Sequence, residues 1–216
     1  MKQNQNYQIK LNRKLFSACQ ENSIENVKLA IENGSDVNFK SDKGKSPLHF
    51  ACQNQKSNSF EIIKYLISKK ASINVKTKKG QETPLHLACQ FQKNKNSIEI
   101  IKYLIENGAD VNVRNKENDS PLHLACQFQK NQKAFEMIKY LIENKAYVNA
   151  RNANNKTPLH LVCQFQNQPN SIEIVKYLIE KEADVNVKSH PLIQTPLHYV
   201  FQYQKIKKMN LKLLKL

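Results

Sequence analysis

The sequence predicts a mainly α-helical solenoid, in which helix-turn-helix units are joined by hairpin-like turns. The main observation is a Ser/Thr-Pro-Leu-His motif that occurs five times, with a step of 37 residues and of 38 at the last copy. A second apolar segment with helical spacing follows the first four copies. Repeats with a period of about 20 to 50 residues indicate a solenoid, a propeller or an array. The prolines of the motif are Pro47, Pro84, Pro121, Pro158 and Pro196.

Each motif marks the start of a first helix. Thr83 is a good N-cap residue, and the residue before a proline is biased away from helical geometry. Pro84 suits the first helical position, because the N–H that it lacks would have no partner within the helix. The first helix of each repeat is therefore expected to begin at the proline.

A second helix is predicted to begin about twelve residues after this proline in the third repeat. Asn96 and Glu99 have the spacing of a capping box, and Ile100, Ile101 and Leu104 form the apolar side of a helix. The first two positions therefore predict the helix start and the other three its buried face. The same Asn and Glu spacing recurs at Asn22/Glu25, Asn58/Glu61 and Asn170/Glu173.

Glycine and asparagine mark two turns in each repeat. Gly34 and Gly108 are expected in left-handed conformation at the end of the second helix. Lys70, Lys145 and Glu182 replace them elsewhere, at an expected cost of about 1 kcal/mol each. The turn before the Pro-Leu-His motif carries Gly44, Gly80, Asn118 and Asn155, which suit left-handed geometry.

Three segments in a fixed order resemble the ankyrin repeat: Thr-Pro-Leu-His-x-Ala, then Glu-Ile-Ile/Val-Lys-x-Leu-Ile, then Gly-Ala-Asp-Val-Asn. The resemblance covers about residues 14–216. The period differs, because the family repeats about every 33 residues and this chain every 37. The additional residues lie between the two helices of a repeat, and they suggest a first helix that is one turn longer.

The predicted organisation is a loose N-terminal arm, residues 1–13, followed by one array, residues 14–216. Leu15 to Cys19 match the first helix of later repeats, so the first repeat is interpreted as an N-terminal cap. The last repeat has no clear second helix, and it is either a degenerate cap or the point where a longer array is cut. The expected repeats are 14–37, 38–74, 75–112, 113–149, 150–186 and 187–216.

Histidine and cysteine recur at the spacing of the repeats, histidine in the second to sixth repeats and cysteine in the first to fifth. The resemblance to ankyrin implies that the histidines join the turn to the helix start by hydrogen bonds. Helices about 8 to 10 Å apart are too distant for a shared zinc ion or for disulfides between neighbours. No cofactor, no metal and no catalytic activity is predicted. The two series are His49, His86, His123, His160 and His198, and Cys19, Cys52, Cys89, Cys126 and Cys163.

Composition places the protein among intracellular proteins, with the cytoplasm expected and the nucleus as the alternative. Residues 1–10 contain no apolar stretch like that of a secretory signal, and no segment approaches about 18 uninterrupted apolar residues. The net charge is +16, but only three of the 34 basic residues are arginine. This balance does not favour nucleic acid, for which the arginine fork is better suited.

The resemblance implies a non-enzymatic protein-interaction module that binds its partner on the concave face. An acidic or disordered partner segment is expected toward the N-terminal half, where lysines dominate; the oligomeric state is left open. The alternatives are binding of a polyanion or an anionic membrane surface, the latter through residues 205–216, and an adaptor part of a larger protein. The expected contact residues are Asp42, Lys43, Lys45, Lys78, Lys79, Gln81, Lys116, Glu117, Asp119, Ala153, Asn154 and Lys156.

Three phenylalanines are additional candidates. Phe91, Phe128 and Phe165 follow the Cys-Gln pair at the expected end of the first helix. Each comes four residues after an apolar residue on the side of the helix that borders the core. Two interpretations stay open, namely packing against the additional residues and an aromatic stripe on the concave face.

Overall fold

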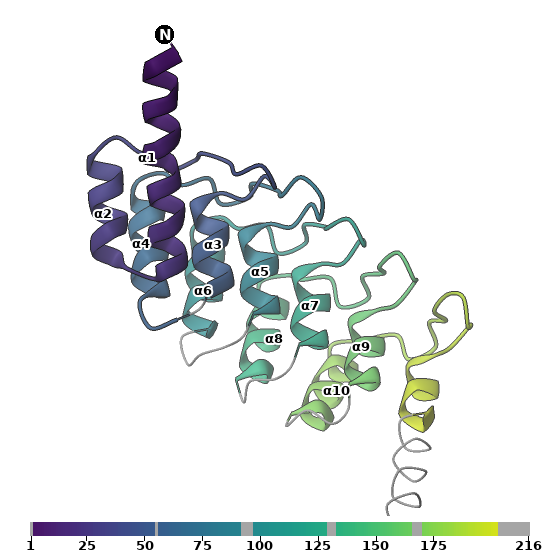
Figure 1. The fold of residues 1–216 in the computed structure, drawn as a ribbon. Helices are drawn as coiled ribbons and strands as arrows, with labels where there is room; N and C mark the ends of the chain where they lie inside the picture. Colours follow the sequence, from purple (N-terminus) through teal and green to yellow (C-terminus); the bar gives the residue numbers. More distant parts are fainter. Residues whose placement is uncertain (1, 55, 92–96, 129–132, 166–169, 203–216) are drawn as a thin grey trace, which may run out of the picture.

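Two rows of helices stack side by side along the molecule (Figure 1). The computed structural model describes residues 2–54, 56–91, 97–128, 133–165 and 170–202. All regular structure in these residues is helical, which confirms the predicted solenoid. The inner helices are α1 (Lys2–Glu21), α3 (Pro47–Asn54), α5 (Pro84–Gln90), α7 (Pro121–Gln127) and α9 (Pro158–Gln164), and the outer helices are α2 (Ile24–Glu32), α4 (Ser59–Ser68), α6 (Ser97–Glu106), α8 (Ala134–Glu143) and α10 (Ser171–Glu180).

Each helix contacts its counterparts in the neighbouring pairs, so the core is continuous from α1 to α10. The fully buried side chains of this core include Leu48, Ile62 and Leu104. A further helical segment, residues 196–202, follows α9 among the inner helices. Because each pair packs mainly on its neighbours, the stability of the array arises between pairs rather than around one centre.

Five connections, called fingers here, project from the same side of the stack (Figure 1). Each joins an outer helix to the next inner helix: finger 1 is 33–46, finger 2 is 69–83, finger 3 is 107–120, finger 4 is 144–157 and finger 5 is 181–195. Neighbouring fingers are linked by backbone bonds, such as Lys78 N–H to Lys43 O at 3.0 Å and Ala153 N–H to Glu117 O at 2.9 Å. The fingers therefore form a connected surface.

The outer helices end as predicted, in a left-handed residue. Gly108 has φ 92°, and Lys70, Lys145 and Glu182 have φ 65°, 67° and 62°. At α4 the N–H of Lys70 bonds to Ile67 O and that of the next residue to Leu66 O, which is the Schellman arrangement.

A series of asparagines fastens each finger to the end of the next outer helix. Asn112 Nδ2 donates to Lys145 O at 2.9 Å, and its Oδ1 accepts the N–H of Tyr147 at 2.9 Å. One side chain thus bonds to the backbone carbonyl of the left-handed residue and to the backbone N–H of the residue two positions later. The same pair of bonds is made by Asn38, Asn74 and Asn149.

At the N-terminal end, α1 supplies these bonds itself. Asn12 Oδ1 accepts the N–H of Asp36 at 2.8 Å, and Gln8 Nε2 donates to Gly34 O at 2.7 Å. Asn12 and Leu11 are buried. The predicted loose arm is therefore wrong, because residues 2–13 belong to α1, in which Gln8 and Asn12 make the bonds that a preceding finger makes elsewhere.

The predicted side-chain capping by asparagine at the starts of the outer helices is also wrong, although Asn58 and Asn170 are the N-cap residues of α4 and α10. At α2 the N-cap is Ser23, whose Oγ accepts the N–H of Asn26 at 3.2 Å, whereas Asn22 has φ 63°. Asn58 and Asn170 stand at N-cap positions with ψ near zero and make no side-chain capping bond, because such capping requires extended backbone. Asn96 lies outside the described residues.

The inner helices are not a turn longer than expected for the family. Helix α5 ends at Gln90, and Phe91 has ψ 58° while its N–H still bonds to Leu87 O at 2.9 Å. A positive ψ is incompatible with another helical turn. The remaining inserted residues, 92–96, 129–132 and 166–169, lie outside the described part of the chain.

Candidate interaction surface

A histidine completes the capping box at the start of the inner helices α5, α7 and α9. In α7, His123 Nδ1 accepts the N–H of Ser120 at 3.2 Å, and Ser120 Oγ accepts the N–H of His123 at 3.4 Å. Histidine thus replaces the Glu or Gln that usually closes this motif. The equivalent N–H to Nδ1 bond is 3.1 to 3.2 Å long at His49, His86 and His160.

The same histidines hold the next finger in place. Because Nδ1 accepts a backbone N–H, the ring hydrogen is on Nε2, which donates to a carbonyl of the following finger. Burial lowers the pKa of His49, His86 and His123 to about 4, so these rings are neutral at neutral pH. The four Nε2 atoms bond at 3.0 to 3.1 Å to the carbonyls of Glu82, Asp119, Lys156 and Gln194.

These acceptors define a row of residues along the fingers, called the inner row here. Lys45 occupies the same place in finger 1, where its carbonyl closes the finger by accepting the N–H of Ser41 at 2.9 Å. Glu82 closes finger 2 in the same way with the N–H of Thr77. The members of the inner row are Lys45, Glu82, Asp119, Lys156 and Gln194.

Glutamines on the inner helices face the two lysines of this row. Lys45 Nζ donates to Gln53 Oε1 at 2.6 Å, and Lys156 Nζ donates to Gln164 Oε1 at 3.0 Å. These bonds cross the angle between fingers and inner helices. The concave face is defined here as the surface that the fingers and the inner helices form together on the two sides of this angle.

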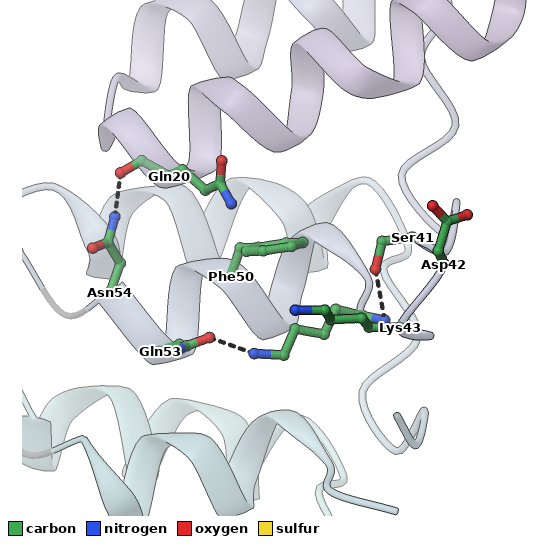
Figure 2. A pocket seen from close by; sticks show the side chains of 8 residues that line it. Gln20, Ser41, Asp42, Lys43, Phe50, Gln53 and Asn54 are labelled. Carbon is green, nitrogen blue, oxygen red and sulfur yellow. Dashed lines mark hydrogen bonds between the residues drawn. The ribbon is translucent and has the colours of Figure 1, made fainter. Parts of the chain in front are cut away.

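A groove of about 550 Å³ opens at the N-terminal end of the concave face (Figure 2). The Phe50 ring lies in the middle of it, with its centroid 5.2 Å from that of Phe16 and 5.8 Å from Lys45 Nζ. Asn54 Nδ2 donates to Gln20 O at 2.6 Å and joins α3 to α1. The groove is lined by Gln20, Ser41, Asp42, Lys43, Lys45, Phe50, Gln53 and Asn54.

Partial burial shapes the electrostatics of the inner row. It lowers the pKa of Lys45 and raises that of Glu82, while the attraction between these two opposite charges opposes both shifts. Burial also raises the pKa of Asp119, against a hydrogen bond of 2.8 Å from Asn152. Glu117 raises the pKa of both carboxyl groups by repulsion. The row is therefore positive at its two lysines and negative between them.

Comparison with known proteins identifies the family of the chain. A family model described as ankyrin repeats (3 copies) matches residues 15–115, 92–189 and 132–214. The chain belongs to the ankyrin repeat family. It is also 38% identical over 82 residues, 38% of the chain, to the ankyrin repeat and KH domain-containing protein mask-1 of Caenorhabditis elegans. The matched residues cover 3% of that relative's length.

Ankyrin repeats are generally non-enzymatic protein-interaction modules, and this is the general role predicted from the sequence. In the part of the chain that the structure describes, no three His, Cys, Asp or Glu side chains are grouped so that they could hold a metal ion. No helix among the described residues is both long and apolar enough to cross a membrane.

The predicted contact residues of the ankyrin repeats lie on the fingers, in two settings. Lys45, Asp119 and Lys156 are half-buried members of the inner row. Only the three from finger 1 line the N-terminal groove together, namely Asp42, Lys43 and Lys45. The exposed ones are Asp42, Lys43, Lys78, Lys79, Gln81, Lys116, Glu117, Ala153 and Asn154.

The predicted set in finger 2 is one residue out of register. Its closing bond, Thr77 N–H to Glu82 O, spans five residues, whereas that of finger 1, Ser41 to Lys45, spans four. Finger 2 therefore contains one additional residue, and Gln81, with φ 51°, takes the left-handed place expected for Gly80. The equivalent of Lys45 is Glu82, which the prediction missed.

Sequence spacing contains the signals for the missed residues. The segment from Asn74 to Pro84 is one residue longer than the equivalent segment from Asn38 to Pro47, and this difference indicates the longer finger. Gln53 and Gln164 each follow the motif proline by six residues, so the positions of these glutamines can also be found by counting along the sequence. The missed glutamines are Gln53 and Gln164, and Gln90 and Gln127 stand at the equivalent positions of α5 and α7.

The three phenylalanines lie just past the ends of α5, α7 and α9 and are half-buried. Phe91 and Phe128 pack against the hydrophobic core. This position fits the packing interpretation, and a role of these half-buried side chains in binding stays a prediction. The lysines of the tail, from residue 205 on, lie outside the described residues.

The cysteines are buried, reduced thiols. Burial raises the pKa of Cys19 to about 12 and that of Cys163 to about 11, and it raises the pKa of Cys52, Cys89 and Cys126 further. A thiol is nucleophilic only as thiolate, so the folded protein keeps these groups inert.

Proposed function

We propose that the chain binds an extended protein segment along its concave face and that an acidic part of this segment occupies the N-terminal groove. The observation that carries this proposal is the groove of about 550 Å³, which combines an aromatic ring with the ammonium groups of Lys43 and Lys45. Ligand sites generally pair apolar surface with a few well-placed polar groups.

The lysines of this end suit a carboxylate partner. Lys45 is held by Gln53 and lies near the Phe50 ring, so little side-chain freedom is lost when it binds an anion. Lys43, Lys78 and Lys79 are exposed on fingers 1 and 2 and add positive potential around the groove. Such a potential attracts an acidic segment and speeds its association.

A matched pair of charge reversals tests the proposal. One variant changes Lys43, Lys45, Lys78 and Lys79 to Glu. The control changes four exposed lysines of the outer helices, Lys28, Lys102, Lys139 and Lys176, to Glu, so the net charge is the same. Binding of a fluorescent Glu-rich peptide is measured by anisotropy at about 50 mM salt, and folding by circular dichroism.

We expect the finger variant to bind at least about tenfold more weakly than the control. Equal affinity of the two folded variants would contradict a groove-specific site. If both variants bind more weakly than the parent protein by the same factor, the alternative, a general polyanion binder, is favoured. This alternative is checked by titrating salt in binding assays with duplex DNA and anionic vesicles. The expected cytoplasmic or nuclear location stays a prediction, with which buried reduced thiols are compatible.

A further inference from the structure

Two lysines of the concave face are built into the surface in the same way. Lys45 and Lys156 both belong to the inner row, and each donates to a glutamine eight residues later, at 2.6 and 3.0 Å. Each ammonium group also lies near an aromatic ring, Phe50 at 5.8 Å and Tyr199 at 4.8 Å from the centroid. Both side chains are half-buried and positioned before any partner binds.

The two repeats between them carry the opposite charge in the same row. Glu82 and Asp119 are half-buried, and burial raises the pKa of both carboxyl groups. Their backbone is held by His49 and His86, as the backbone of Lys156 is held by His123. The four side chains therefore occupy equivalent places, and their charges follow the order positive, negative, negative, positive.

We propose that the concave face selects an extended protein segment with two acidic groups, one for Lys45 and one for Lys156, and with no acidic residue between them. This inference rests on the proposed function and specifies the partner. Three repeats separate the lysines, which at about 8 to 10 Å per repeat gives about 24 to 30 Å. An extended chain rises about 3.3 Å per residue, so about seven to nine residues separate the acidic groups.

The energetics favour recognition of the pair over recognition of either charge alone. One partly exposed ion pair strengthens binding by at most about fivefold, which gives little selectivity. When two acidic groups are linked at the correct distance, the second contact forms within the complex and gains from a high effective concentration. Acidic residues opposite Glu82 and Asp119 are rejected, because like charges facing each other at an interface are costly.

A peptide series tests the distance. Each fluorescent peptide carries two Glu-Glu pairs separated by a proline-rich spacer of about 2, 5, 8 or 11 residues, which stays extended at about 3.1 Å per residue. A peptide with one pair serves as the reference. We expect the tightest binding at about 8 residues, at least about tenfold tighter than the reference. Affinity that does not depend on spacer length would overturn the inference.

Substitutions test the two lysines. Lys45→Gln and Lys156→Gln should each reduce the affinity for the best peptide to the level of the single-pair reference, and the double variant should bind more weakly than this reference, because neither ammonium group remains. Lys176→Gln, an exposed lysine of α10, removes the same charge and should leave the affinity unchanged. An unchanged affinity of Lys156→Gln would overturn the inference even if Lys45→Gln weakens binding.

The two proposals fail in different ways. If the single-pair peptide binds through the N-terminal lysines and a second pair adds nothing, the proposed function stands and the two-site inference is wrong. If neither the single-pair peptide nor any two-pair peptide binds at about 50 mM salt, both are wrong. Circular dichroism of each variant confirms that the fold is intact in every comparison.

Discussion

Each buried histidine connects the start of its own helix with the next finger. His123 closes the capping box of α7 through Nδ1 and holds Lys156 of the next finger through Nε2. A protonated ring would lose the first bond, because Nδ1 would then be a donor facing another donor. The neutral state is therefore part of the packing between repeats.

Acid should destabilise the protein between about pH 6.5 and pH 4. The pKa of His49, His86 and His123 is near 6.5 in the unfolded chain and about 4 in the folded one. The unfolded state therefore binds more protons in this range, and the free energy of unfolding falls as the pH falls. Each histidine contributes up to about 1.4 kcal/mol per pH unit. Urea unfolding at a series of pH values measures this slope.

The variant His123→Gln separates the histidine effect from other acid effects. Glutamine can still accept the N–H of Ser120 in a capping box, but it does not titrate. We expect a lower stability at pH 7, because the bond to Lys156 O is lost, and a smaller slope between pH 6.5 and 4. Curves that stay parallel to those of the parent protein would show that His123 does not cause the pH dependence.

The left-handed lysines carry backbone strain that glycine would relieve. Lys145 has φ 67° at the end of α8, where Gly34 and Gly108 stand at the equivalent positions of α2 and α6. Lys145→Gly should raise the free energy of unfolding by about 1 kcal/mol, since only glycine adopts this conformation without steric cost. As a control, Lys139→Gly within α8 should lower it by about 1 kcal/mol. Destabilisation by both substitutions would argue against strain at Lys145.

Contact between fingers is the main constraint at the level of elements. Gly44 has φ 76°, and a Cβ atom added there would lie 2.6 Å from the backbone nitrogen of Lys78 in finger 2. Gly34 has φ 91°, and a Cβ atom there would meet nothing within 4 Å. The two glycines share the same kind of conformation but differ in their surroundings.

This difference predicts unequal costs for the same substitution. Gly34→Ala should lower the free energy of unfolding by about 1 kcal/mol, the cost of left-handed geometry alone. Gly44→Ala should cost at least about 1 kcal/mol more, because finger 2 must move away and its bond from Lys78 N–H to Lys43 O is strained. Chemical denaturation measures both, and hydrogen exchange at Lys78 reports the finger contact. Equal costs would contradict the close approach of the fingers.

The helices and fingers also show which features could be predicted from the sequence alone. The period and the Pro-Leu-His motif predict the inner helices correctly, because proline and its N-cap residue act locally. The role of Asn12 depends on contacts between repeats, which the family pattern does not contain. Counting from Asn74 to Pro84 could have located Glu82, whereas the pairing of Lys156 with Gln164 required the structure.

The two ends of the array differ at the level of the whole molecule. Ser17 and Asn26 are exposed at the N-terminal end, where internal repeats carry the buried Leu87 and Ile100 at the equivalent positions. The N-terminal end is thus polar. At the other end of the described array Ile172 is 75% exposed, although the equivalent Ile98 is 2% exposed.

A solenoid loses structure first where a repeat has the fewest packed neighbours. Leu197, in the last described helical segment, is 58% exposed, whereas Leu85 at the equivalent position of α5 is buried. We therefore expect the repeats around α9 and α10 to open before the central ones. The buried thiols provide one reporter in each repeat from α1 to α9.

Cysteine labelling should reveal this order. Burial holds the pKa of Cys163 at about 11 and raises that of Cys89 further, so both are unreactive thiols in the folded protein. With increasing urea, iodoacetamide should modify Cys163 first and Cys89 only at the main unfolding transition, as measured by peptide mass spectrometry. A Cys163→Ser variant serves as the control for the effect that modification of Cys163 itself has on stability. Simultaneous labelling of both thiols would mean that the array opens as one cooperative unit, because the packing between repeats then outweighs the exposure of Ile172 and Leu197.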